Sequence, residues 1–150
     1  MITLEYKSGR QFNMASTIVI LDDEQERLTA MSAVLSKRLP EYDLVTFKNA
    51  PDTIGWLDSN LASAAIISLD HDLFPQSDNE PDPGTGRDVA DFLATQSPVC
   101  HVIIHTTNSL AAPGMELVLS DQGWTNSRVV PFNDLEWVTV WWIREVLDHL

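Results

Sequence analysis

Apolar and polar residues alternate along the chain in two recurring patterns. Short continuous apolar runs are rich in β-branched residues, which favour strands. They cover residues 17–21, 44–47, 65–69, 102–105 and 128–132. The stretches between them place apolar residues three or four positions apart, which is typical of helices. These predicted helices cover residues 25–38, 50–61, 87–96, 110–121 and 135–150.

The regular alternation of strand and helix predicts a single α/β domain over residues 16–150. Strands that are apolar along their whole length are typical of a parallel sheet buried on both faces. We therefore expect five parallel strands covered by helices on both sides, a three-layer sandwich. Residues 1–15 do not follow the alternation. They form either an extra edge strand or an N-terminal extension without a place in the sheet.

Acidic residues follow two of the predicted strands directly. Asp22 and Asp23 come after the first apolar run, and Asp70 comes after the third. In an open parallel sheet, ligands bind beyond the carboxyl ends of the strands. Carboxylates gathered there repel one another unless a cation binds between them, and oxygen ligands favour a hard ion. We predict a Mg²⁺ or Mn²⁺ site formed by these three residues, although acids at this point also favour a helix N-terminus.

Two histidines lie beside the same predicted edge. His71 follows Asp70 directly, and His105 ends the fourth apolar run. A neighbouring carboxylate holds an imidazole in one tautomer, which suits acid–base chemistry near neutral pH. We predict that His71 or His105 acts as general base or acid and that Asp72 orients a histidine. The alternative is a structural role in which each histidine is held by hydrogen bonds.

Hydroxyl, amide and basic side chains near this edge are candidates for phosphate binding. Thr106, Thr107 and Asn108 follow the fourth run, where they can donate hydrogen bonds to an oxyanion. They can also cap the helix that follows. Arg87 lies at the start of a predicted helix behind two glycines, and a substrate phosphate would need such a basic residue.

The charge and the cysteine content limit the partners of the chain. There are 22 acidic and 9 basic residues, which give a net charge of −13 at pH 7. No basic stripe is present for a phosphate backbone, so tight binding of long duplex nucleic acid is excluded. A small nucleotide or an RNA end stays compatible if a metal ion shields the charge. No run is long enough for a membrane span, and the single cysteine, Cys100, fits a reducing cytoplasm.

The last predicted helix carries three of the five tryptophans, at positions 137, 141 and 142. Its apolar residues occupy more than one face, which is typical of a helix buried on several sides. The helix either packs deeply against the sheet or exposes a surface through which the protein forms a homodimer. His101 and His149 have no acidic cluster beside them, and we interpret both as surface residues.

The order of these features resembles the receiver domains of two-component signalling over residues 16–150. The resemblance implies a sheet of flavodoxin-like strand order, a Mg²⁺ site and a phosphorylated aspartate. Asp22 and Asp23 match the acidic pair, Asp70 matches the phosphoacceptor, and Thr106 or Thr107 matches the switch hydroxyl. Receivers carry a lysine followed by proline at the fifth strand, whereas the segment VVPFND has no lysine.

Three further segments resemble the receiver-derived family of cyclic-phosphate processing receiver domains. They are LDHDL at residues 69–73, GRDVA at residues 86–90 and HTTN at residues 105–108, with PGM at residues 113–115 as a weaker match. The family resemblance implies action on cyclic phosphate ends of RNA or nucleotides. Two functions therefore stay open, a metal-dependent phosphoesterase and a non-catalytic degenerate receiver that binds a protein partner.

Overall fold

The computed structural model describes residues 15–132 and 134–150, so the predicted extension at residues 1–15 lies outside it apart from its last residue. The described residues form the predicted three-layer α/β fold. Its strands are β1 (Thr17–Leu21), β2 (Asp43–Phe47), β3 (Ala64–Leu69), β4 (His101–His105) and β5 (Asn126–Val129). Its helices are α1 (Gln25–Arg38), α2 (Ala50–Asn60), η1 (Leu61–Ser63), α3 (Gly86–Leu93), α4 (Ala112–Asp121), η2 (Val138–Trp142) and α5 (Ile143–Asp148).

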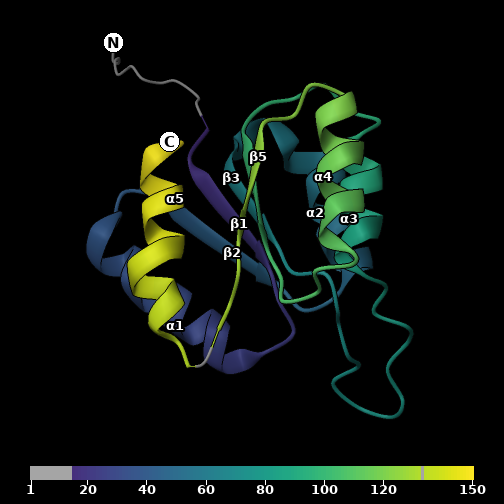
Figure 1. Cartoon of the computed structure of the whole chain (residues 1–150), viewed down its shortest axis with the longest axis horizontal. Coiled ribbons are helices and arrows are strands. Elements are labelled where there is room, and N and C mark those ends of the chain that lie inside the picture. The colour runs from purple at the N-terminus through teal and green to yellow at the C-terminus, as the bar shows by residue number, and fades with distance from the viewer. Residues whose placement is uncertain (1–14, 133) are drawn as a thin grey trace.

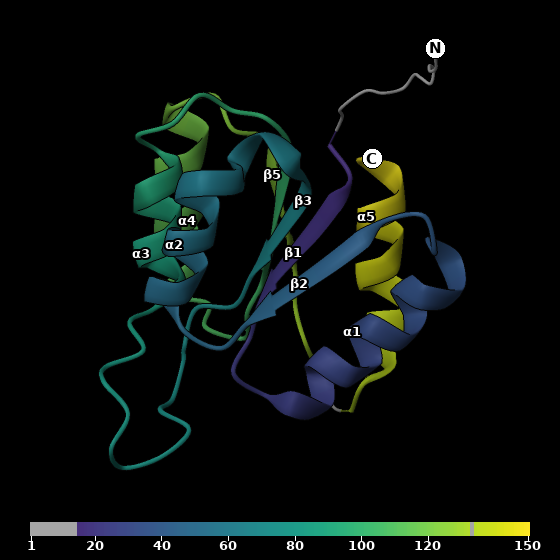
Figure 2. The same cartoon turned by 180° about the vertical axis from the view of Figure 1, so that it is seen from behind.

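The five strands form one parallel sheet in the order β2-β1-β3-β4-β5. α1 and α5 cover one face, and α2, α3 and α4 cover the other (Figures 1 and 2). The order changes direction between β1 and β3, which is where sheets of this kind bind ligands. The long loop between β3 and α3 extends beyond the carboxyl ends of the strands (Figure 1). Within the described ranges, no helix combines the length and the apolar character that a membrane span requires.

Alternate side chains of the central strands supply two separate apolar layers. Val19 and Leu21 of β1 pack toward α2, α3 and α4, whereas Ile18 and Ile20 pack toward α1 and α5. All four are buried. Burying a large aliphatic side chain contributes about 1.5–3 kcal/mol, so both layers stabilise the sheet substantially. The carboxyl ends of the strands are therefore held rigidly enough to position polar side chains.

The end of the chain differs from the prediction in two places. β5 spans Asn126–Val129, so the strand predicted at residues 128–132 begins two residues earlier and ends before Pro131, which has no N–H to donate. The predicted helix at residues 135–150 contains a π-helical turn, η2, in which the N–H of Ile143 bonds the carbonyl of Val138. This wider turn lies where Trp137 and Trp142 are fully buried.

His101 is buried rather than at the surface, so its interpretation as a surface residue was wrong, whereas His149 is exposed. The two rings stack with centroids 3.6 Å apart. His101 also contacts the hydroxyls of Thr125 and Ser127, at 2.9 and 2.8 Å. The sequence did not reveal this burial because the partners of His101 lie far away along the chain, at Thr125, Ser127 and His149. Only tertiary packing brings them together.

Acid is expected to destabilise the fold partly through His101. Burial lowers the pKa of this residue from 6.5 to about 4, and His149 adds to that shift while Glu145 opposes it. Between pH 6.5 and pH 4 the unfolded chain binds a proton that the folded chain does not bind. Stability therefore falls as the pH falls through this window, by up to about 3 kcal/mol from this residue.

Urea unfolding of the wild type and of His101→Gln at several pH values measures this contribution. The variant is expected to lose less stability than the wild type between pH 6.5 and pH 4. Identical pH dependence of the two free energies of unfolding would contradict the assignment.

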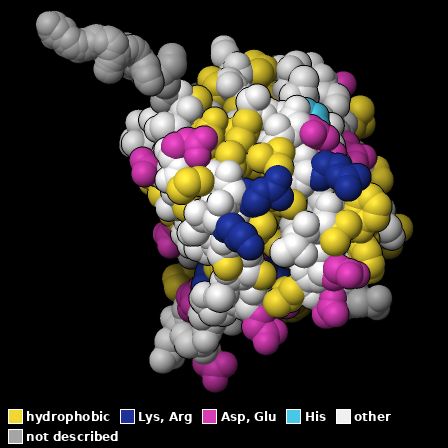
Figure 3. Space-filling view, turned by 90° about the vertical axis from the view of Figure 1, so that its left-hand side faces the viewer, with side chains coloured by type: hydrophobic (Ala, Val, Ile, Leu, Met, Phe, Trp, Pro, Cys, Tyr) yellow, Lys and Arg dark blue, Asp and Glu magenta, His cyan; other side chains and the backbone are white. Residues whose placement is uncertain are grey.

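Only a small part of the last helix is exposed enough to form the predicted homodimer interface. Trp137 and Trp142 pack into the core, but Trp141 is 48 % exposed and lies with Val130 and Arg144 along a groove of about 380 Å³. Hydrophobic and basic side chains share the face formed by α1 and α5 (Figure 3). If this face joins two copies, Trp141→Glu should shift a dimer toward monomer in analytical ultracentrifugation. A wild-type monomer at tens of micromolar would rule the homodimer out.

Candidate active site

Three carboxylates meet at the carboxyl ends of β1 and β3. Asp22 is fully buried, Asp70 is nearly so, and Asp23 is partly exposed. Each of the three offers an oxygen within 4.8 Å of the other two. The register explains the meeting, because Leu21 pairs with Leu69 and the acids follow these residues in step. The structure thus brings together the residues predicted to bind a metal ion.

The two buried carboxylates of this cluster have opposite pKa shifts. Burial raises the pKa of Asp70 to about 6, and the neighbouring Asp22 adds to the rise against the lowering effect of His105 and Arg27. Burial acts on Asp22 in the same direction, but the hydrogen bond and charge of His105 outweigh it, so the pKa of Asp22 is lowered. Asp22 is therefore readily ionised, whereas ionisation of Asp70 beside it is favoured by a nearby cation.

The chemistry of the donor set fits a divalent ion. Carboxylate oxygens are hard ligands, which Mg²⁺ and Mn²⁺ prefer. Burial is the main cause of the raised pKa of Asp70, and a bound cation would favour its ionised form. Asp22, Asp23 and Asp70 are the residues that would hold such an ion.

Arg27 is a functional candidate that the sequence reading missed. It lies in the first turn of α1, where one guanidinium nitrogen is 3.5 Å from Asp22 and also 3.5 Å from Asp70. Its other terminal nitrogen is 3.6 Å from Glu24, and the guanidinium lies over the ring of Trp137 at 5.7 Å. The positive charge of Arg27 therefore lies beside the carboxylates that match the receiver site. The fifth strand of this chain has no lysine that could supply such a charge.

His105 is placed as a buried orienting residue. Its Nε2 is 3.0 Å from Asp22, and its Nδ1 is 2.7 Å from the hydroxyl of Ser68. That hydroxyl accepts the indole N–H of Trp142 at 2.9 Å. Because an ionised Asp22 only accepts hydrogen bonds, His105 donates to it from Nε2. Both ring nitrogens are occupied and the side chain is fully buried, so this geometry favours positioning of Asp22.

His71 is the less buried of the two histidines at this edge. Its Nδ1 is 2.8 Å from Asp72, while the side-chain amide of Asn108 donates to both oxygens of Asp72 at 3.2 and 3.3 Å. The backbone N–H of His71 donates to Asp70 at 2.7 Å. A carboxylate at Nδ1 leaves Nε2 as the atom that can accept a proton. The structure therefore brings His71, Asp72 and Asn108 together, as an oriented histidine beside the carboxylates.

The remaining phosphate-binding candidates differ in how exposed they are and in the contacts they make. Thr106 is buried, and its hydroxyl accepts the backbone N–H of Asn108 at 3.1 Å, whereas Thr107 is exposed beside the site. Arg87 pairs with Asp91 one turn further along α3, at 2.8 Å. The described contacts of Arg87 thus hold it on the surface of α3, and Arg27 is the basic residue that reaches the carboxylates.

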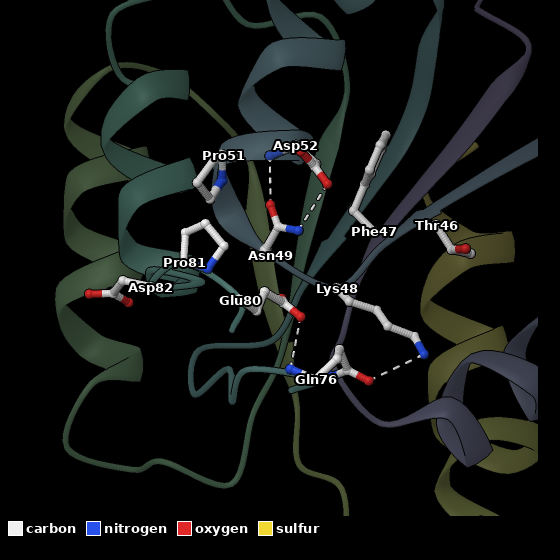
Figure 4. A pocket seen from close by; sticks show the side chains of 10 residues that line it. All are labelled: Thr46, Phe47, Lys48, Asn49, Pro51, Asp52, Gln76, Glu80, Pro81 and Asp82. Carbon is white, nitrogen blue, oxygen red and sulfur yellow. Dashed lines mark hydrogen bonds between the residues drawn. The ribbon is translucent and has the colours of Figure 1, made fainter. Parts of the chain in front are cut away.

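The β3–α3 loop contacts the carboxylate cluster and forms a cavity next to it. The backbone N–H of Phe74 donates to Asp23 at 2.9 Å, and the amide of Gln76 donates to the carbonyl of Asp23 at 3.3 Å. The loop and the start of α2 enclose about 550 Å³ (Figure 4). Asn49 there bonds Asp52 through both ends of its amide, and Lys48 bonds Gln76.

The fold and the acidic cluster together define a receiver-like protein. Solved receiver structures agree with this fold. The phosphorylated cyanobacterial phytochrome response regulator RcpA has a TM-score of 0.65 at 16 % identity, covering 87 % of this chain and 91 % of that chain. The response regulator domain of CheB from Thermotoga maritima has a TM-score of 0.63 at 12 % identity, covering 89 % and 95 %.

The family follows from a second comparison. Residues 17–121 match the family model described as cyclic-phosphate processing receiver domain. The chain therefore belongs to this family, as its LDHDL, GRDVA and HTTN segments predict. No curated protein matches the chain.

Proposed function

We propose that the protein is a metal-dependent phosphoesterase that opens the cyclic phosphate of a 2′,3′-cyclic nucleotide or of an RNA end. The observation that carries the proposal is the meeting of three kinds of group at one sheet edge. Three carboxylates suit a divalent ion, Arg27 adds a fixed positive charge, and His71 is oriented by Asp72. The family name supports the substrate class.

Asp22, Asp23 and Asp70 would hold Mg²⁺ or Mn²⁺. A bound divalent ion supplies neutralisation of phosphate charge and makes a water molecule more acidic. His105 keeps Asp22 in place from behind, and the N–H groups of Glu24 and His71 fix one oxygen each of Asp22 and Asp70. These contacts hold the carboxylates in one arrangement, so little reorganisation accompanies binding.

The side chains of the chain itself then handle the proton and the phosphate. His71 Nε2 accepts a proton from water as the water oxygen bonds to phosphorus. The bond from phosphorus to the 2′ or 3′ oxygen breaks, and that oxygen takes up a proton from solvent water, which leaves a nucleoside monophosphate once His71 returns its own proton to solvent. Arg27 and Thr107 would bind the non-bridging oxygens, where negative charge develops.

Hydrolysis of a 2′,3′-cyclic nucleotide, followed by ³¹P NMR, tests this function. We expect a 2′- or 3′-monophosphate with Mg²⁺ or Mn²⁺ and loss of turnover with EDTA. Absence of turnover with any divalent ion would contradict the proposal. Acetyl phosphate labelling provides the comparison with the other function, because a stable adduct at Asp70 would favour a signalling receiver.

A further inference from the structure

A cavity of about 460 Å³ lies between the start of α1, the β4–α4 loop and the connection from β5 to η2. Its lining includes Arg27 and Thr107, which the proposed mechanism places on the phosphate. Arg27 contacts Asp22 and Asp70 on one side and Trp137 on the other. The cavity therefore lies directly beside the proposed position of the phosphate.

One part of the lining is apolar and open to a flat ligand. Phe132 is 44 % exposed and Leu135 is 36 % exposed, and both line the cavity together with Pro131. Exposed aromatic side chains bind nucleobases by stacking, which is tolerant of base identity. Apolar side chains next to a phosphate-binding arginine thus suit the nucleoside part of a nucleotide.

The rest of the lining consists mainly of hydrogen-bond acceptors. Glu24, Glu26 and Asp134 contribute carboxylates to the cavity wall. Carboxylates accept hydrogen bonds but cannot donate them, so they select a base edge that carries N–H groups. Guanine offers two adjacent donors, at N1 and at the 2-amino group, which match the two oxygens of one carboxylate. Uracil presents carbonyl oxygens on both sides of its single N–H, and these oxygens would be repelled.

The larger cavity of about 550 Å³ beside α2 is less suited to this role. Its polar side chains already form hydrogen bonds with one another. Asn49 bonds the carboxylate of Asp52, and Lys48 bonds the amide oxygen of Gln76 (Figure 4). Its connection to the cluster runs through Gln76, which bonds the carbonyl of Asp23. A base bound there would have to break these contacts.

We infer that the cavity bounded by Arg27, Thr107 and Phe132 is a nucleobase subsite that prefers guanine over uracil. This inference rests on the proposed cyclic-phosphate hydrolysis for its substrate and adds the base as the specificity element.

Steady-state kinetics of Phe132→Ala test the subsite with three substrates, the 2′,3′-cyclic phosphates of guanosine and uridine and a base-free ethylene cyclic phosphate. The wild type is expected to show a KM for the guanosine compound roughly 10-fold below that for the uridine compound. Phe132→Ala should raise the guanosine KM by roughly 10-fold with kcat unchanged, and it should leave the base-free substrate unaffected. Leu117→Ala removes an exposed apolar side chain from α4 and serves as the control.

Equilibrium binding of guanosine 3′-monophosphate, measured by calorimetry with Mg²⁺, separates failure of the subsite from failure of the proposed function. Hydrolysis with equal KM for all three substrates would overturn the subsite and leave the phosphoesterase intact. Binding that weakens in Phe132→Ala, in a protein without turnover, would support the subsite and contradict the phosphoesterase. Neither turnover nor binding would overturn both.

Discussion

Replacing His71 with alanine is expected to lower kcat for cyclic-phosphate hydrolysis by about 100- to 10,000-fold, the usual contribution of a general acid or base. Among the described residues, His71 makes its side-chain contacts through Nδ1, whereas both nitrogens of His105 are engaged. In the proposed mechanism the carboxylates and Arg27 bind the substrate, so KM should change much less than kcat.

Two variants make the His71 experiment specific. Asp72→Asn should lower kcat less than His71→Ala and should shift the pH profile, because it disturbs the orientation of the ring without removing it. His149→Ala removes an exposed histidine at the opposite end of the sheet and should leave kcat unchanged. Wild-type turnover in His71→Ala would show that another group moves the proton.

Gly86→Ala is expected to destabilise the fold by about 3 kcal/mol or more. Gly86 begins α3 where its N–H bonds the carbonyl of His71 at 2.9 Å. A methyl group there would collide with the backbone carbonyl of Asp70 and would lie 3.1 Å from the Cα of His71. Backbone cannot rotate away as a side chain can, so α3 would have to separate from the tip of β3.

Gly55→Ala is the matched control for this substitution. Gly55 lies inside α2, and a methyl group added there meets no atom within 4 Å. Alanine favours a helix over glycine, so this variant should be more stable by about 0.5–1 kcal/mol. Urea unfolding of both variants checks the pair. A Gly86→Ala protein within 1 kcal/mol of the wild type would contradict the close approach of α3 to β3.

The fold and the carboxylate cluster were predictable because both follow from repeating local patterns. Apolar runs alternating with helical spacing predict a parallel sheet, and parallel strands place their carboxyl ends at one edge. The pairing of Leu69 with Leu21 on one side and with Ile104 on the other then brings Asp22, Asp70 and His105 together. No detail of side-chain packing is needed for this result.

The contribution of Arg27 could not be predicted from the sequence in the same way. Arg27 reaches the cluster only because α1 docks against the sheet with this face turned toward Asp70. Helical spacing shows which residues share a face of α1, but it does not show how far the helix slides along the sheet. The separation of five positions from Asp22 to Arg27 was the available signal, since a side chain in the first turn of α1 can return to the end of β1.

The sequence gives a clearer indication that His105 is buried. Side chains two apart on a strand share one face of the sheet. Ile103 lies two residues before His105 and belongs to the same buried apolar cluster as Trp137 and Trp142. The same reasoning places Ser68 on that face, two residues after Ile66. Alternation along β4 therefore indicates that His105 points beneath the last helix, although it cannot name Ser68 as its partner.

Anomalous diffraction from a crystal soaked with Mn²⁺ and a slowly hydrolysed 2′,3′-cyclic phosphorothioate tests the central claim most directly. We predict a manganese peak between Asp22, Asp23 and Asp70, with the thiophosphate next to Arg27 and His71 Nε2 facing the phosphorus. A peak elsewhere, with Asp70 still paired to Arg27 and the ligand absent from this edge, would contradict the account.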